Sequence, residues 1–160
     1  MILDKLSDDI LNALKICSDI ANNEQIKIFL IGGVVRDLLI DKQTLDIDVC
    51  LESDAIEFAN ILKKENKIEI LQIQPDLHTV KVQFSNDVIL DLASTRKEAY
   101  PKASYLPEIT DFYCPLSEDI KRRDFTINSM MIDILTNELI DPFNGKNDLE
   151  NKIIRIQKRR

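Results

Sequence analysis

The sequence predicts one domain of the α+β or α/β class, in which helices pack on a mixed sheet. Three observations lead to this prediction: an amphipathic stretch opens the chain, short segments with strand-like alternation follow, and stretches with helical periodicity separate some of them. The chain has 160 residues, of which 44% are hydrophobic and 31% are charged. This length and composition are those of a globular protein with one sizeable core.

The first expected elements are a helix, a strand and a second helix. Residues 3–21 carry apolar side chains at intervals of three and four, which is typical of a helix with one buried stripe. Residues 26–31 form an apolar run, and this run predicts a short buried strand. Gly32 and Gly33 end the run, so a second helix is expected over 34–40.

The next strand carries acids in an otherwise apolar stretch. Residues 45–51 alternate strictly, as the two faces of a half-buried strand do. One face holds Leu45, Ile47, Val49 and Leu51, and the other holds Asp46, Asp48 and Cys50. A helix is expected over 54–65, with Ser53 as its N-cap and Glu57 supporting that cap.

A hairpin and a less regular second half follow. Strands are expected over 68–73, 78–84 and 88–93, and Asn86-Asp87 fits a hairpin turn between the last two.

The segment 96–118 contains three prolines and three tyrosines without a clear period, which predicts a long loop. A helix over 118–128, a strand pair over 130–135 and 138–141, and a short helix over 148–152 complete the expected elements.

Charge and cysteine content restrict the class of protein. The net charge of −7 argues against a nucleic-acid binder, which usually has a basic balance, although residues 152–160 contain five basic residues and no acid. Cys17, Cys50 and Cys114 have neither disulfide nor zinc spacing, which indicates reduced thiols in a cytoplasmic protein. No apolar run approaches the roughly 20 residues of a membrane helix, and the acidic N-terminus does not resemble a signal peptide, so no membrane partner is expected.

Asp46, Asp48 and Asp91 form a candidate metal site. Asp46 and Asp48 lie two residues apart on one face, about 6.6 Å along a strand, and Asp91 is a third acid in a strand that is otherwise fit for burial. Carboxylates this close raise one another's pKa unless a cation neutralises them, and Mg²⁺ suits such a set. The alternative is a pair of acids on a solvated strand face.

Gly32, Gly33 and Arg36 form a candidate phosphate site. Glycines at a strand-to-helix turn let the backbone approach a ligand, and the N–H groups at the start of the helix, together with Arg36, can bind phosphate. The alternative is a simple turn in which Arg36 pairs with a surface acid such as Asp37. The pattern matches neither the Rossmann nor the P-loop motif.

The segment 118–130 contributes Arg122, Arg123, Asp124 and Asn128. Arg123 could bind a triphosphate, and Asp124 with Asn128 could hydrogen-bond ribose hydroxyls. The alternative is a cluster of ion pairs on a helix surface.

Four ordered segments together resemble a known family. They are G-G-V-V-R-D-L-L with D-I-D downstream, then D-L-A-S-T-R-K-E-A-Y, then R-R-D-F-T-I-N, then D-P-F-N-G-K-N-D-L. In this order they are similar to the catalytic head of the class II tRNA nucleotidyltransferase and bacterial poly(A) polymerase family, within the DNA polymerase beta-like superfamily. The resemblance extends from about residue 26 to the last residue.

The resemblance implies an α+β head, with a mixed, mostly antiparallel sheet and helices packed on it. It implies that Asp46, Asp48 and Asp91 are catalytic metal ligands for two Mg²⁺ ions. It also implies a set of nucleotide-binding residues, namely Gly32, Gly33, Arg36, Arg122, Arg123, Asp124 and Asn128. The implied reaction adds C and/or A nucleotides from CTP or ATP to the 3′ end of tRNA and releases pyrophosphate.

The expected organisation is an N-terminal helix (1–25) packing on a catalytic head (26–145), followed by the start of a connection (146–160). In the family, the residues that choose the base lie on a neck domain after the head, so neck and body domains are expected beyond this chain. Three alternatives remain open: a non-catalytic nucleotide- or RNA-binding relative, a poly(A) polymerase acting on other RNA, and a smaller nucleotidyltransferase that modifies a protein or small molecule.

Overall fold

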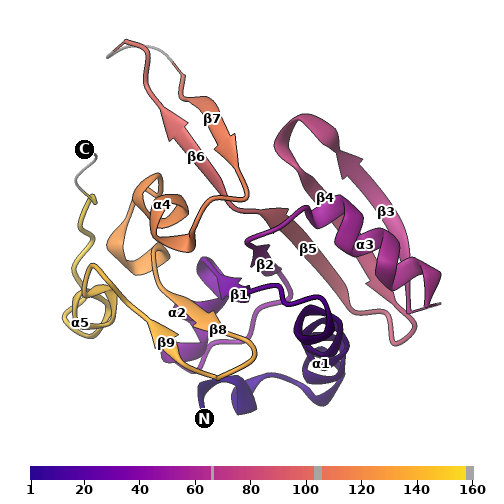
Figure 1. Ribbon diagram of the computed structural model, residues 1–160. Coiled ribbons are helices and arrows are strands. Elements are labelled where there is room, and N and C mark those ends of the chain that lie inside the picture. Colours follow the sequence, from indigo (N-terminus) through magenta and orange to yellow (C-terminus); the bar gives the residue numbers. More distant parts are fainter. Residues whose placement is uncertain (66, 103–105, 158–160) are drawn as a thin grey trace.

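A seven-stranded sheet forms the centre of the computed structural model, which describes residues 1–65, 67–102 and 106–157 (Figure 1). Its strands, in spatial order, are β3 (Ile68–Gln74), β4 (Thr79–Phe84), β5 (Ile89–Ser94), β2 (Ile47–Leu51), β1 (Ile28–Ile31), β8 (Met131–Asp133) and β9 (Leu139–Ile140). Only β2 and β5 pair in parallel, and the other neighbouring strands are antiparallel. The expected mixed, mostly antiparallel sheet is therefore confirmed.

The remaining elements are helices and a separate two-stranded ribbon. The helices are η1 (Ile2–Lys5), α1 (Asp8–Asn23), α2 (Gly33–Leu39), α3 (Ala55–Lys64), η2 (Pro75–Leu77), α4 (Leu116–Lys121), η3 (Thr126–Asn128) and α5 (Gly145–Glu150). The ribbon consists of β6 (Arg96–Ala99) and β7 (Glu108–Phe112), and Figure 1 shows it projecting from the body of the molecule. Among the described residues, no helix combines the length and hydropathy needed to cross a membrane.

Two faces of the sheet are packed unequally. Helices α1 and α3 cover one face, where side chains such as Val49, Leu51 and Leu92 are fully buried in the main core. On the other face, α4 supplies Leu116 and Ile120 to a smaller apolar cluster. The strand residues of this smaller cluster are Phe29, Ile31, Cys50 and Met131. The face that carries Asp48 is thus the more thinly covered one, and a site can open there.

Local capping explains where two predicted helices differ from the observed ones. The helix expected over 3–21 starts at Asp8, because the Ser7 hydroxyl accepts a hydrogen bond from the Ile10 N–H and caps it. The cap of α3 is Asp54 and not Ser53: its carboxylate accepts from the N–H groups of Ile56 and Glu57. A carboxylate also complements the positive end of the helix dipole.

The segment expected to be a long loop over 96–118 is largely ordered, and that prediction is wrong. Its ends pair as β6 and β7, and Phe112 at the base of the ribbon stacks on His78, with 3.8 Å between ring centroids. The short strand β6 is charged, and half-buried positions alternate with exposed ones along it, so hydrophobic periodicity did not reveal it.

Two smaller differences affect the candidate site, and two further expectations are confirmed. The helix expected over 118–128 is two short helices, α4 and η3, separated by residues 122–125. Leu45 lies before β2 and is 91% exposed, so it does not belong to the buried face of that strand. The expected pair at 130–135 and 138–141 is confirmed as β8 and β9, and Asn86-Asp87 is the turn of the β4–β5 hairpin.

Candidate active site

Two of the three predicted metal ligands lie side by side. Asp48 on β2 and Asp91 on β5 are register partners in the parallel pair, so their side chains leave the same face of adjacent strands, about 4.8 Å apart. Asp48 is half-buried, and the side chain of Asp91 is 44% exposed. Asp46 is exposed one residue before β2, and its N–H donates to the Thr44 hydroxyl.

Electrostatic interactions link the three carboxylates with two cations. Burial raises the pKa of Asp48, and the charges of Asp91 and Asp46 raise it further. Arg123 and Lys81 act in the opposite direction and lower that pKa. The site therefore concentrates negative charge that the neighbouring protein cations offset only in part, and an added cation would be stabilised there.

The donor set fits a magnesium ion chemically. Carboxylate oxygens are the ligands that this hard cation prefers, and Mg²⁺ typically takes one or two of them and completes its octahedron with water and phosphate oxygens. Within the ranges that the structure describes, no three acidic, histidine or cysteine side chains are gathered closely enough to hold an ion by themselves. An ion held by Asp48 and Asp91 would therefore need further ligands, such as water or phosphate oxygens.

The Gly32-Gly33 turn follows β1 directly and leads into α2. Gly32 has φ +72° and ψ −141°, a conformation that is essentially restricted to glycine, although open space surrounds its α-carbon. A Cβ on Gly33 would lie 3.2 Å from Nη2 of Arg36, so the guanidinium folds back over the start of the helix. The turn and Arg36 thus share one small region, as the phosphate-site prediction requires.

Arg36 connects this turn with the segment that contains Asn128. Its Nη1 donates to Oδ1 of Asn128 at 2.9 Å, and its Nε donates to Oδ1 of Asp37 at 3.1 Å. The Arg36–Asp37 pair of the alternative reading is therefore present, but Asp37 is buried and is not a surface acid. The bond to Asn128 adds a contact that the sequence did not reveal, and it brings two predicted nucleotide-binding residues together.

Arg122 and Arg123 are anchored on a carboxylate that the sequence analysis missed. Asp119 is fully buried, and it accepts from Nε of Arg122 at 3.3 Å and from Nη2 of Arg123 at 3.0 Å. Its third donor is the N–H of Arg96, at the start of the ribbon. The spacing of three and four residues within one helix could have indicated the two arginine pairs.

A second missed residue fixes the segment that contains Asp124. Gln157 is 3% exposed, and its N–H donates to the carbonyl of Asp124 at 2.8 Å. Its side-chain amide donates to the Ile120 carbonyl and accepts from the Ser129 hydroxyl. The last described residue therefore ties the end of α4 to η3, and the predicted nucleotide-binding segment lies between these two points.

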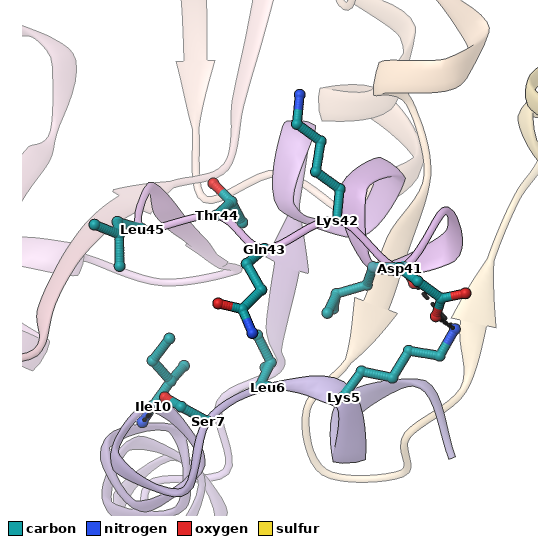
Figure 2. A pocket seen from close by; sticks show the side chains of 10 residues that line it. Lys5, Leu6, Ser7, Ile10, Asp41, Lys42, Gln43, Thr44 and Leu45 are labelled. Carbon is teal, nitrogen blue, oxygen red and sulfur yellow. Dashed lines mark hydrogen bonds and ion pairs between the residues drawn. The ribbon is translucent and has the colours of Figure 1, made fainter.

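A pocket of about 410 Å³ lies away from these residues (Figure 2). It is formed between the N-terminal segment and the loop 41–45, which the ion pair from Lys5 to Asp41, 2.7 Å long, holds together. None of the predicted site residues lines it. The loop ends next to Asp46, so the pocket borders the site without being part of it.

Known sequences resemble most of this chain. The sequence model of the family described as Poly A polymerase head domain matches residues 28–155. The A-adding tRNA nucleotidyltransferase of Aquifex aeolicus is 35% identical over 82% of this chain and 16% of its own length. That of Halalkalibacterium halodurans is 34% identical over 94% of this chain and 35% of its own length. The chain therefore spans well under half of these relatives.

Solved structures agree with the observed fold. An apo CCA-adding enzyme superposes with a TM-score of 0.87 at 29% identity, over 98% of this chain and 37% of that one. A complex of a CCA-adding enzyme with ATP superposes with a TM-score of 0.79 at 27% identity, over 98% of this chain and 36% of that one.

Proposed function

Because this chain belongs to the poly(A) polymerase head domain family, we propose that it is the catalytic head of a template-independent RNA nucleotidyltransferase. Its substrates are CTP and/or ATP and the 3′ end of a tRNA, and its second product is pyrophosphate. The relatives that act as A-adding or CCA-adding enzymes and the solved ATP complex support this choice of substrates.

The pairing of Asp48 with Asp91 is the observation that carries the proposal. Two carboxylates in register on parallel strands, one of them with a pKa raised by burial and by its acidic neighbours, would suit a divalent cation that binds together with a triphosphate. An acidic pair on a solvated strand face would not need a glycine turn at the end of the neighbouring strand and Arg123 close to it. The presence of all three acids also argues against the non-catalytic alternative.

The residues have separate roles in the proposed reaction. Gly32, Gly33 and Arg36 bind the triphosphate through backbone N–H groups and the guanidinium. Arg122 and Arg123 offer guanidinium groups to the phosphates. Asp119 fixes the positions of both groups. Asp124 and Asn128 orient the ribose.

The chemical step is a displacement at the α-phosphorus. The acceptor 3′-hydroxyl oxygen forms the new bond to this phosphorus, the bond to the bridging oxygen of the β-phosphate breaks, and the hydroxyl proton passes to solvent. Asp46, Asp48 and Asp91 would hold two magnesium ions, which supply Lewis-acid stabilisation of the attacking and leaving oxygens. The protein groups contribute position and charge.

The domain division remains part of the same proposal. Residues 1–25 form a helical segment packed on the head, 26–145 form the catalytic head, and 146–160 begin a connection. The buried side chains of η1 and α1 within the main core support the first assignment.

An extension assay tests the function. The chain is incubated with magnesium, a tRNA lacking its 3′ CCA and labelled CTP or ATP in separate reactions. Label on the RNA 3′ end supports the proposal, and the nucleotide used distinguishes A addition from C addition. Asp48→Asn should lower the rate by about 10³-fold or more, because metal stabilisation of the transition state amounts to several kcal/mol.

Other outcomes identify the alternatives. Label on the protein instead of the RNA would indicate a nucleotidyltransferase that modifies protein, and efficient extension of RNA unrelated to tRNA would indicate a poly(A) polymerase. Nucleotide binding without transfer, also after addition of the remaining two thirds of a relative, would indicate a non-catalytic relative.

A further inference from the structure

The loop 41–45 leads into β2, and an exposed leucine stands at its end. Leu45 occupies a bend and is 91% exposed, and Asp46 follows it outside the strand that carries Asp48. The bend is closed by a local hydrogen bond, which the Asp46 N–H donates to the Thr44 hydroxyl at 3.2 Å. A large apolar side chain is therefore left in solvent directly beside a predicted metal ligand.

The pocket between this loop and the N-terminal segment offers an apolar environment to that side chain (Figure 2). Its apolar lining consists of Leu6, Ile10, Leu38 and Leu45 itself. Leu6 and Leu38 are buried in the main core, and Ile10 packs against that core. The pocket of about 410 Å³ is therefore an opening at the edge of the main core, and it has room for a leucine side chain.

The alternation of β2 assigns each residue of a longer strand to a face. Leu45 has the parity of Ile47 and Val49, whose side chains are buried in the main core. Asp46 has the parity of Asp48, so their side chains would leave the opposite face together. If β2 began at Leu45, the leucine would therefore face the core and the pocket, and Asp46 would join the other carboxylates.

The neighbouring strand β5 has a position for such an extension. The pairing of β2 with β5 begins at Ile47, whereas β5 itself begins at Ile89, one residue before the partner of Ile47. Continued by one residue, this parallel register places Asp46 beside Ile89. One residue further, it places Leu45 beside Val88, which packs against the main core. The surroundings on β5 thus agree with a buried leucine at this point.

We propose that Leu45 is a positioning residue, which inserts into this pocket and thereby brings Asp46 to the other two carboxylates. This inference rests on the proposed function. The structure shows the bent form of the loop, and the inserted form extends β2 by two residues. The inserted form is favoured when a divalent cation offsets the repulsion between the three carboxylates.

Opposing contributions set the balance between the two forms. Insertion removes the leucine side chain from water, whereas the crowding of carboxylates and the loss of the Thr44 hydrogen bond oppose it. The ion pair between Lys5 and Asp41, 2.7 Å long, holds the start of the loop, and pairing with β5 holds Ile47. The change is therefore confined to residues 43–46.

Leu45→Ala separates a positioning role from a structural one. Because the side chain is exposed in the bent form, the melting temperature without divalent ions should stay within about 1–2 °C of the parent. With ATP held constant, the magnesium concentration that gives half of the rise in melting temperature should increase about tenfold, since the inserted form loses its buried contact. Leu45→Met keeps an apolar side chain and should restore the parent's response. An equal magnesium response of Leu45→Ala and the parent would overturn the inference.

Thr44→Val should act in the opposite direction. The substitution removes the hydroxyl that closes the bend, and valine favours extended strands. The magnesium concentration at half of the rise should fall about two- to threefold, the size expected for the loss of one hydrogen bond from the bent form. An increase, as for Leu45→Ala, would contradict the two forms described here.

Fluorescence reports the insertion directly. The chain contains no tryptophan, so Leu45→Trp introduces a single fluorophore next to a pocket with room for an indole ring. Its emission should shift to shorter wavelengths when magnesium and ATP are added together, and it should return after EDTA. Ile154→Trp is the matched control, because Ile154 is 75% exposed and does not line the pocket, and its emission should not shift. Emission of Leu45→Trp that stays unshifted while the melting temperature of the same variant rises would refute the insertion.

Calorimetry on the unaltered chain separates the two proposals. Titration with ATP in the presence of magnesium, together with the extension assay, reports the proposed function alone. Binding and transfer by the parent, with an unshifted indole and a Leu45→Ala response equal to the parent's, would leave the proposed function intact and refute the positioning role. Absence of both nucleotide binding and transfer would refute the proposed function, and the positioning role with it.

Discussion

At the scale of single residues, the ionised carboxylate of Asp48 lowers the stability of the folded chain. Asp48 is a half-buried acid with a second carboxylate at its register position, and burial and charge both disfavour its ionised form. A structural protein would gain from a neutral residue here. The retention of charge is consistent with a role in binding a cation, since sites often trade stability for function.

Asp48→Asn tests this destabilising effect of Asp48 through the pH dependence of stability. The pKa of Asp48 is higher in the folded state than in the unfolded chain, so its contribution to stability is fully present at low pH and is lost as pH rises through the folded pKa. Without divalent ions, the free energy of unfolding of Asp48→Asn should therefore fall less than that of the parent between about pH 4 and 7.

Urea denaturation at several pH values measures the difference. Asp19→Asn is a control at an exposed position of α1 and should follow the parent. Identical pH profiles for Asp48→Asn and the parent would contradict the burial and repulsion described for Asp48.

The two glycines should respond differently to alanine. Gly32→Ala forces an L side chain into a conformation essentially restricted to glycine, and should cost about 1–3 kcal/mol of stability. Gly33→Ala should change stability less, because the group it meets is the far end of the Arg36 side chain, which needs to shift by only a few tenths of an ångström. It should instead raise the KM for ATP or CTP by displacing that guanidinium. Thermal melts and nucleotide titrations compare the pair, and equal losses of stability would contradict this division.

At the scale of elements, α4 and the residues after it form a support for two arginines. The helix is short and ends at Lys121, yet its buried Asp119 holds Arg122, Arg123 and the backbone of Arg96. Arg96 begins the ribbon, so one carboxylate fixes the ribbon and the predicted nucleotide-binding segment together. Arg122 also approaches Glu98 of β6 at 3.8 Å.

Asp119→Ala should destabilise the chain by about 3 kcal/mol, because it leaves the largely buried guanidinium of Arg123 without its counter-ion and that of Arg122 with only the longer contact to Glu98. The affinity for nucleotide should fall as well, since Arg123 loses its fixed position. Glu118→Ala is the matched control: Glu118 is the preceding residue and pairs with exposed Lys121. Chemical denaturation distinguishes the two variants, and an equal, small effect for both would refute the supporting role of Asp119.

Sequence patterns revealed the elements that local periodicity determines. The alternation around Asp48 and Asp91 was sufficient to place both on strands, and the four ordered motifs indicated the family. Asp119 and Gln157 were missed because their importance depends on partners brought together by tertiary packing. The ribbon was missed because its pairing joins two charged or mixed segments that carry no strong apolar signal.

At the scale of the whole molecule, charge and packing are divided between the faces of the sheet. The main core lies under α1 and α3, while the carboxylates and their cations occupy the opposite face. The net charge of −7 makes nonspecific RNA binding by this chain weak. Local cations such as Lys81 and Arg123 should therefore contribute more to RNA binding than the net charge of the chain does.

Magnesium should stabilise the folded chain as a whole. A ligand that binds only the native state contributes about 2.7 kcal/mol at a hundredfold excess over its Kd. We expect the melting temperature to rise when magnesium and ATP are added together and to return after EDTA. The rise should be absent in Asp48→Asn, and a rise of equal size in that variant would place the metal elsewhere.

The parallel pairing of β2 with β5 also has a consequence for the order of folding. All of α3, β3 and β4 lies between the two strands in the chain, so the carboxylates meet only after this whole segment has been placed. Contacts between residues so distant in sequence form late and slowly. In a stopped-flow refolding experiment, the capacity to bind magnesium should therefore recover after helical ellipticity, and it would report completion of the native topology.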